Sequence, residues 1–201
     1  MISNIAADVA LFFANKNAYP HEQIASYKYG FQLMISTIIS CICVVVISAF
    51  MDSIIMALLF MLSFVPLRMT AGGYHAKHHW SCIWGFNLIF FGFSLLCKYL
   101  DMRFTLIYSL FAIIFSSLMV WTFSPVEAPN KPLPDQKKIH NRNHSLIISS
   151  AGLAIVILAC YSPNSPVKLL SYWASGYLAG GILLPVAYYS NKHAIKQAEN
   201  G

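Results

Sequence analysis

Apolar residues in this chain gather into six long runs separated by shorter polar segments. The runs cover roughly residues 31–50, 53–67, 83–100, 104–123, 145–161 and 168–189. A helix needs about 20 mostly apolar residues to cross the hydrocarbon core of a bilayer. The pattern therefore predicts about six transmembrane helices. The second and fifth runs are short, so they tilt little, thin the bilayer or extend into flanking polar sequence.

Residues 1–28 precede these runs and carry a different pattern. Apolar side chains recur there at three- and four-residue spacing, at Ile2, Ile5, Val9, Phe12 and Phe13. This spacing predicts an amphipathic helix, which either lies in the membrane interface or packs on other helices of the protein. We expect one multi-pass domain over residues 1–201, with its six spans within 29–190 and its longer polar loops at 68–82 and 124–144.

Composition agrees with a membrane location and fixes an orientation. Hydrophobic residues make up 58% of the chain and charged residues 10%, too few polar groups to cover a soluble globule. Six spans with both termini in the cytoplasm place ten Lys and Arg residues on the cytoplasmic side and three outside. That bias follows the positive-inside rule. The formal charge of +6 is explained in this way, and nucleic acid is not expected as a partner.

The first polar loop holds the residues best suited to covalent chemistry. Cys82 is the one cysteine in polar surroundings, and His75 precedes it by seven residues. On one continuous helix these side chains would lie about 10 Å apart, too far for direct proton transfer, which requires about 3 Å. A working pair therefore requires a bend, or a loop that folds back over a helix starting near Ser81. The Gly72-Gly73 pair makes such a turn sterically easy, and a helix N-terminus at Cys82 favours its thiolate.

Other interpretations of these residues remain open at this point. His75 and His79, and likewise His78 and Cys82, are spaced to share a helical face that could bind Zn²⁺ or haem. No carboxylate lies in this loop and the chain has no HExxH or CxxC motif. Alternatively, the histidines are interfacial polar groups. The remaining cysteines, Cys41, Cys43, Cys97 and Cys160, are expected to be buried small hydrophobic residues.

The second polar loop is rich in proline. Pro125, Pro129, Pro132 and Pro134 fall within eleven residues, which predicts a stiff, extended segment. At a membrane surface this segment is either a ledge that docks a peptide or a rigid spacer. Basic residues follow it, and they bind anionic lipid by default, with an acidic peptide as the alternative.

Together these features resemble the accessory gene regulator B family, the membrane peptidases of bacterial peptide quorum sensing. The resemblance rests on one pattern, Arg-x-x-Ala-Gly-Gly-x-His-x₆-Cys, and covers nearly the whole chain after about residue 20. Its residues are Arg68, Ala71, Gly72, Gly73, His75 and Cys82. The Pro125–Leu133 loop, the six apolar runs and the basic loops support it. His78 and His79 do not belong to the family pattern, so their role stays open.

The resemblance implies a cysteine endopeptidase at the cytoplasmic face of the bacterial cell membrane. Such an enzyme removes the C-terminal tail of a small ribosomal propeptide, with Cys82 as nucleophile and His75 as base. The acyl-enzyme thioester is then opened by water, or by an internal Cys or Ser that closes a thiolactone or lactone. Exclusion of water favours cyclisation. A non-enzymatic membrane protein, either a His-ligated metal or haem carrier or a scaffold, is the alternative.

Supporting roles are expected for a second group of residues. Arg68 is a candidate for binding the acidic tail of the propeptide or for anchoring a span at the headgroups. Gly72 and Gly73 allow the substrate backbone to approach, or form an oxyanion hole. The second loop supplies further candidates for orienting His75 or binding substrate, namely Glu127, Asn130 and Lys131.

The expected partners are the propeptide, membrane lipids and a second copy of the chain. The homodimer is inferred from the resemblance and from a small-residue face in the last run, formed by Gly176, Gly180 and Gly181. Neither a cofactor nor a metal is expected.

Overall fold

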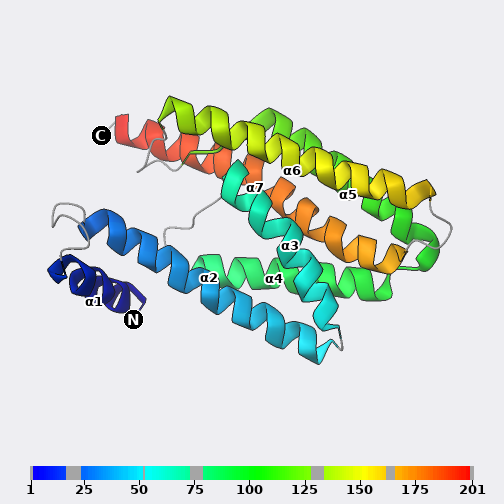
Figure 1. The fold of residues 1–201 in the computed structure, drawn as a ribbon, viewed down its shortest axis with the longest axis horizontal. Helices are drawn as coiled ribbons and strands as arrows, with labels where there is room; N and C mark the ends of the chain where they lie inside the picture. Colours follow the sequence, from blue (N-terminus) through cyan, green and yellow to red (C-terminus); the bar gives the residue numbers. More distant parts are fainter. Residues whose placement is uncertain are drawn as a thin grey trace. The chain divides into compact units, whose positions relative to one another are not determined.

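The structure, a computed structural model, describes residues 2–16, 24–51, 53–72, 79–127, 134–161 and 166–199. The elements in these ranges are helices (Figure 1): α1 (Ile2–Asn15), α2 (Ile24–Phe50), α3 (Ile54–Ala71), α4 (His79–Tyr99), α5 (Met102–Phe123), α6 (Asp135–Tyr161) and α7 (Val167–Glu199). The predicted all-α membrane fold is confirmed.

The helices correspond to the predicted apolar runs in approximate position. Five contain a segment long and apolar enough to cross a membrane: Gly30–Phe50, Ile54–Ala71, Met102–Phe123, Asp135–Tyr161 and Val167–Lys192. The sixth predicted span corresponds to a shorter apolar stretch of α4, Ile83–Tyr99. Helix α2 ends at Phe50 and α3 begins at Ile54, so the first two apolar runs form separate helices.

The two polar loops are shorter than the sequence indicates. Helix α3 continues to Ala71 and α4 already begins at His79, so the loop predicted at 68–82 is helical at both ends. Helix α6 begins at Asp135, inside the loop predicted at 124–144. Both short apolar runs are thus extended into flanking polar sequence. The correction has a simple cause, because a helix satisfies its backbone hydrogen bonds internally whether its side chains are polar or apolar.

The chain divides into two compact units, of which the first comprises Met1–Ile47 and Ala76–Ile89. Helix α1 belongs to it and buries a stripe of small residues, Ala6, Ala10 and Ala14, each 0% exposed. Gln32 of α2 donates a hydrogen bond to the Ser3 hydroxyl at 3.1 Å. The bulky apolar side chains of α1, such as Ile5 and Phe12, are exposed. Helix α1 also contacts α2 through the stacked rings of Phe13 and Phe31, 5.9 Å apart, while a location in the membrane interface stays a prediction.

The second unit comprises Ser48–His75 and Phe90–Gly201. Helix α7 packs against α3 and α5, and α6 covers the same two helices. Glycines permit these close contacts. A Cβ at Gly176 would overlap the Ser63 hydroxyl of α3, and one at Gly181 would lie 2.8 Å from Cα of Ser116 in α5. The small-residue face is therefore used inside the protomer and does not support the predicted homodimer.

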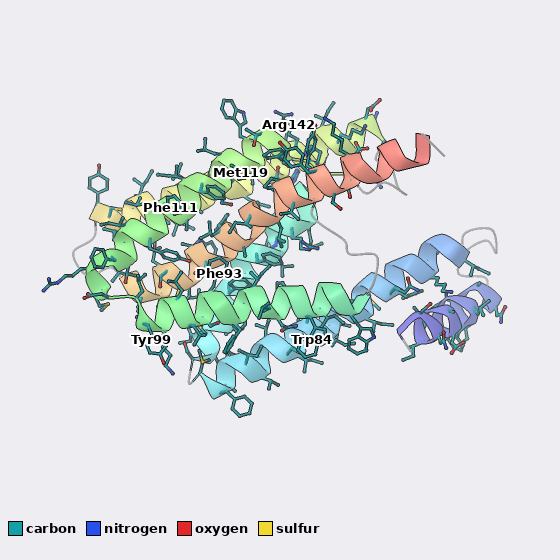
Figure 2. The ribbon with its side chains drawn as sticks, turned by 180° about the vertical axis from the view of Figure 1, so that it is seen from behind. Trp84, Phe93, Tyr99, Phe111, Met119 and Arg142 are labelled. Atoms are coloured by element: carbon teal, nitrogen blue, oxygen red, sulfur yellow. The ribbon has the colours of Figure 1, made fainter. Side chains whose placement is uncertain are left out.

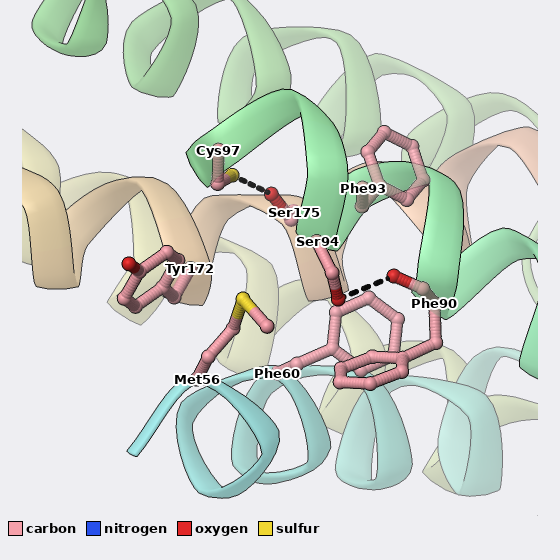
Figure 3. A pocket seen from close by; sticks show the side chains of 8 residues that line it. All are labelled: Met56, Phe60, Phe90, Phe93, Ser94, Cys97, Tyr172 and Ser175. Carbon is pink, nitrogen blue, oxygen red and sulfur yellow. Dashed lines mark hydrogen bonds between the residues drawn. The ribbon is translucent and has the colours of Figure 1, made fainter. Parts of the chain in front are cut away.

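Small polar side chains are buried where α3, α4 and α7 meet in this unit (Figure 3). The Ser175 hydroxyl lies 3.1 Å from the Cys97 sulfur and 2.8 Å from the Tyr108 hydroxyl. Ser94 donates to the Phe90 carbonyl at 2.7 Å. The space between these residues is too narrow for a water molecule. The polar groups are thus satisfied by the protein itself, as a segment in hydrocarbon requires.

The outer faces of the helices carry large apolar side chains. Trp84 in the first unit, and Tyr99 and Phe111 in the second, are 71%, 78% and 60% exposed and project away from their helices (Figure 2). In water such surfaces would be unfavourable, but the lipid of a bilayer accommodates them.

Because Gly176 touches α3, we expect Gly176→Ala to destabilise the protein by about 1–3 kcal/mol through overpacking. Gly92→Ala is the matched control, since a Cβ at Gly92 meets no atom within 4 Å, and alanine is the better helix former. Thermal unfolding in detergent should show a lower Tm for the first variant and an equal or higher one for the second. Equal melting of both variants would contradict the packing.

Candidate functional site

Two polar contacts of the second unit involve side chains near opposite ends of α7. At one end, the Lys168 ammonium donates to the carbonyls of Lys98 and Leu100 at 3.3 and 3.2 Å. At the other, the Asn191 amide donates to the Glu127 carbonyl at 2.6 Å. Lys168 and Asn191 are separated by about 34 Å of α7, at 1.5 Å per residue. The separation is close to the thickness of the hydrocarbon core of a bilayer, about 30 Å.

Helix α3 ends at this second polar end, at a glycine that no other residue can replace without strain. Gly72 has φ 81° and ψ −162°, a region of backbone space that is essentially restricted to glycine. A Cβ at this position would also overlap the carbonyl oxygen of Val126. The backbone conformation and the close contact at Gly72 therefore explain why glycine stands at this position of the motif.

The chain after α5 pairs with this glycine. The Val126 amide donates to the Ala71 carbonyl at 2.9 Å, and Gly72 and Val126 form an isolated parallel bridge. Val126 is buried, and the hydroxyl of Ser124 lies 2.7 Å from that of Ser145 in α6. The beginning of the proline-rich segment is thus fixed against the end of α3. The two motif-bearing loops of the sequence meet at this point.

Glu127 is held by two other helices. Its carboxylate pairs with the Lys138 ammonium of α6 at 2.7 Å, and its carbonyl accepts from Asn191 of α7. Lys138 lies in the polar first turns of α6, and its hydrogen bond with Glu127 raises its pKa above the ordinary value. The carboxylate expected to orient His75 therefore has a lysine partner. Two other candidates, Asn130 and Lys131, lie outside the described residues.

Arg68 and Cys82 occupy helix ends on either side of the first loop. Arg68 lies one turn before Gly72, with its guanidinium over the Phe64 ring at 5.7 Å. Cys82 is the fourth residue of α4, in the helical first turn anticipated from the sequence, although α4 starts two residues earlier than expected. Gly73 and His75 lie outside the described residues, so the proposed pairing of His75 with Cys82 remains a prediction.

The other cysteines differ from one another in burial. Cys97 is buried as expected, whereas Cys41 and Cys43 are half-buried and Cys160 is exposed. The expectation is thus wrong for Cys160 and partly wrong for Cys41 and Cys43. In a membrane helix an apolar residue need not face protein, because lipid accepts it equally well.

A pocket opens beside the paired loops. It has a volume of about 450 Å³ and lies between the segment that follows α5 and the C-terminal part of α7. Its lining consists of Phe123, Pro125, Val126, Glu127, Tyr188, Asn191 and Lys192. No motif in the sequence points to Tyr188, Asn191 or Lys192 as site residues. Their position gives one signal: they lie at the end of the last apolar run, on the same predicted side of the membrane as the two polar loops.

Within the described part of the chain, no three His, Cys, Asp or Glu side chains are placed to hold a metal. His140 and His144 stack with ring centroids 4.0 Å apart, but they form only a pair. The ligand pairs predicted from the sequence include His75 and His78, which lie outside the described residues.

Comparison with known proteins gives one consistent result. The family model described as accessory gene regulator B matches residues 6–183. AgrB-like protein 2 of Clostridium perfringens strain 13 is 27% identical over 195 residues, covering 94% of this chain and 87% of that protein. Accessory gene regulator protein B of Staphylococcus haemolyticus is 25% identical over 158 residues, covering 79% of this chain and 83% of the relative. No solved structure matches significantly.

Proposed function

Because this chain belongs to the accessory gene regulator B family, whose model covers most of its length, we propose that it is a membrane-embedded cysteine endopeptidase. Its substrate is a quorum-sensing propeptide, from which it removes the C-terminal tail. One observation carries the proposal: the Arg-Ala-Gly-Gly-His-Cys pattern begins at the clamped end of α3 and finishes in the first turn of α4. The loop between them holds the base, and a helix N-terminus favours the thiolate of the nucleophile.

The chemistry proceeds in two steps. The Cys82 thiolate attacks a propeptide carbonyl, and the imidazolium of His75 gives its proton to the leaving amine as the C–N bond breaks. The tail departs and an acyl-enzyme thioester remains. An internal Cys or Ser of the propeptide then attacks this thioester and gives its proton to His75. The ring closes as a thiolactone or lactone, the Cys82 thiolate is regenerated, and no ATP is needed because the thioester retains the acyl energy.

The same proposal places both termini and the reacting groups on the cytoplasmic side. Support comes from the two ends of the second unit, which separate Lys98 and Lys168 from Lys138 and Lys192. The more basic end is the one that carries Gly72 and the second loop. By the positive-inside rule this end stays in the cytoplasm.

Alkylation of Cys82 tests the proposed nucleophile. An imidazolium partner keeps a thiol ionised below its usual range, whereas an ordinary thiol loses about tenfold of its thiolate per pH unit below about 8.5. We expect iodoacetamide to modify Cys82 at pH 6.5 about tenfold faster in the unaltered protein than in His75→Ala. His140→Ala, which removes an exposed histidine of α6, should leave the rate unchanged.

Prior incubation with the propeptide encoded beside this gene should protect Cys82 from alkylation. Equal rates in the unaltered protein and His75→Ala, without protection, would contradict the peptidase. Stoichiometric metal in the purified protein that is lost in His79→Ala would favour a metal-binding protein instead.

A further inference from the structure

Part of the lining of the pocket between the second loop and α7 is apolar. Rings form its walls: the Phe123 and Tyr188 centroids lie 5.4 Å apart, and Pro125 and Val126 complete the lining. Its volume of about 450 Å³ falls within the range of about 300–1,000 Å³ that is typical of ligand sites.

Three polar residues, Glu127, Asn191 and Lys192, also line the pocket. The Glu127 carboxylate pairs with Lys138, and the Asn191 amide donates to the Glu127 carbonyl. These interactions tie Glu127 and Asn191 to other parts of the protein, whereas Lys192 is exposed. The two rings together with Pro125 and Val126 form an apolar surface against which a large apolar side chain can pack.

The pocket also lies close to the proposed base along the chain. Val126 lines it and is paired with Gly72, and His75 follows Gly72 by three residues. Three residues span at most about 11 Å. An extended peptide covers the same distance with about three to four residues, so a substrate bound at His75 reaches the pocket with a nearby side chain.

We propose that this pocket is a specificity site that receives one large apolar side chain of the propeptide, located within about four residues of the scissile bond. The inference rests on the proposed peptidase function and adds the substrate feature that it selects. Burial of a large side chain against aromatic rings supplies binding energy remote from the reacting atoms, which can be used to orient the scissile bond.

A change of substrate preference tests the pocket. In the unaltered protein, alanine in place of the one apolar residue that occupies the pocket should lower kcat/KM by about 10–100-fold. Tyr188→Ala enlarges the pocket, so tryptophan at that substrate position should gain about tenfold over the native residue. Tyr188→Trp narrows the pocket and should shift the preference toward smaller residues. Each preference is the ratio of kcat/KM for two substrates measured with the same variant. It therefore does not depend on the fraction of that variant that is folded.

Tyr189→Ala is the matched control. Tyr189 also stacks near Phe123, at 6.2 Å between centroids, but does not line the pocket. It should leave the preference unchanged. If both Tyr188 variants cleave with the substrate preference of the unaltered protein, or if Tyr189→Ala shifts the preference equally, the pocket is not the specificity site. The proposed peptidase activity would not be affected by that result. Absence of cleavage by the unaltered protein would overturn the peptidase itself and the pocket with it.

Discussion

Replacing Gly72 with alanine is expected to lower propeptide processing on the order of 100-fold while the helical bundle stays folded. Two effects combine. Alanine disfavours φ 81° with ψ −162°, which costs about 1–3 kcal/mol, and its Cβ overlaps the Val126 carbonyl oxygen. The bridge must open to relieve the overlap. The segment that leads from α3 to His75 then starts from a different position. A shift of about 1 Å in a reacting group is enough to lower the rate about 100-fold.

The loss should appear in kcat/KM, because Val126 also lines the pocket. Gly92→Ala is again the control, because its Cβ meets no atom within 4 Å. Melting in detergent separates lost activity from lost folding. Full processing by Gly72→Ala would show that the paired loops do not position the reacting groups.

The second large effect concerns the reacting groups themselves. Cys82→Ala removes the nucleophile and His75→Ala removes the proton carrier, so each should lower the rate of tail removal by on the order of 10⁴-fold. The double variant should lose little more than either single one, since the two groups act as a unit. Cys160→Ala, at an exposed position of α6, should process normally. A rate loss below tenfold in Cys82→Ala would rule out its role as nucleophile.

Much of the fold follows from the sequence because hydrophobic length is a strong signal in a membrane protein. Six apolar runs predicted about six spans, and α1 was expected from its spacing. Helix ends are less predictable, as α3 and α6 show. Arg68 and Lys138 interrupt the apolar pattern but not the helix, since backbone hydrogen bonds continue through polar residues.

Contacts between residues far apart in the sequence could not be predicted from sequence patterns. The three glycines of α7 look suited to a dimer, yet Gly176 and Gly181 face α3 and α5 of the same chain. Sequence spacing indicates a small face and not which helix occupies it. Likewise, nothing local to Gly72 indicates Val126 as its partner, because the two are far apart in the sequence and meet only through the packing of α3, α5 and α7.

Intact-mass analysis of the propeptide tests the central claim most directly. The neighbouring propeptide is co-expressed with the unaltered protein, Cys82→Ser and His75→Ala. We expect a product that lacks the C-terminal tail and weighs one water less than the linear acid, formed only by the unaltered protein. A full-length propeptide in all three cultures, or the same truncated product with Cys82→Ser, would contradict the proposed peptidase.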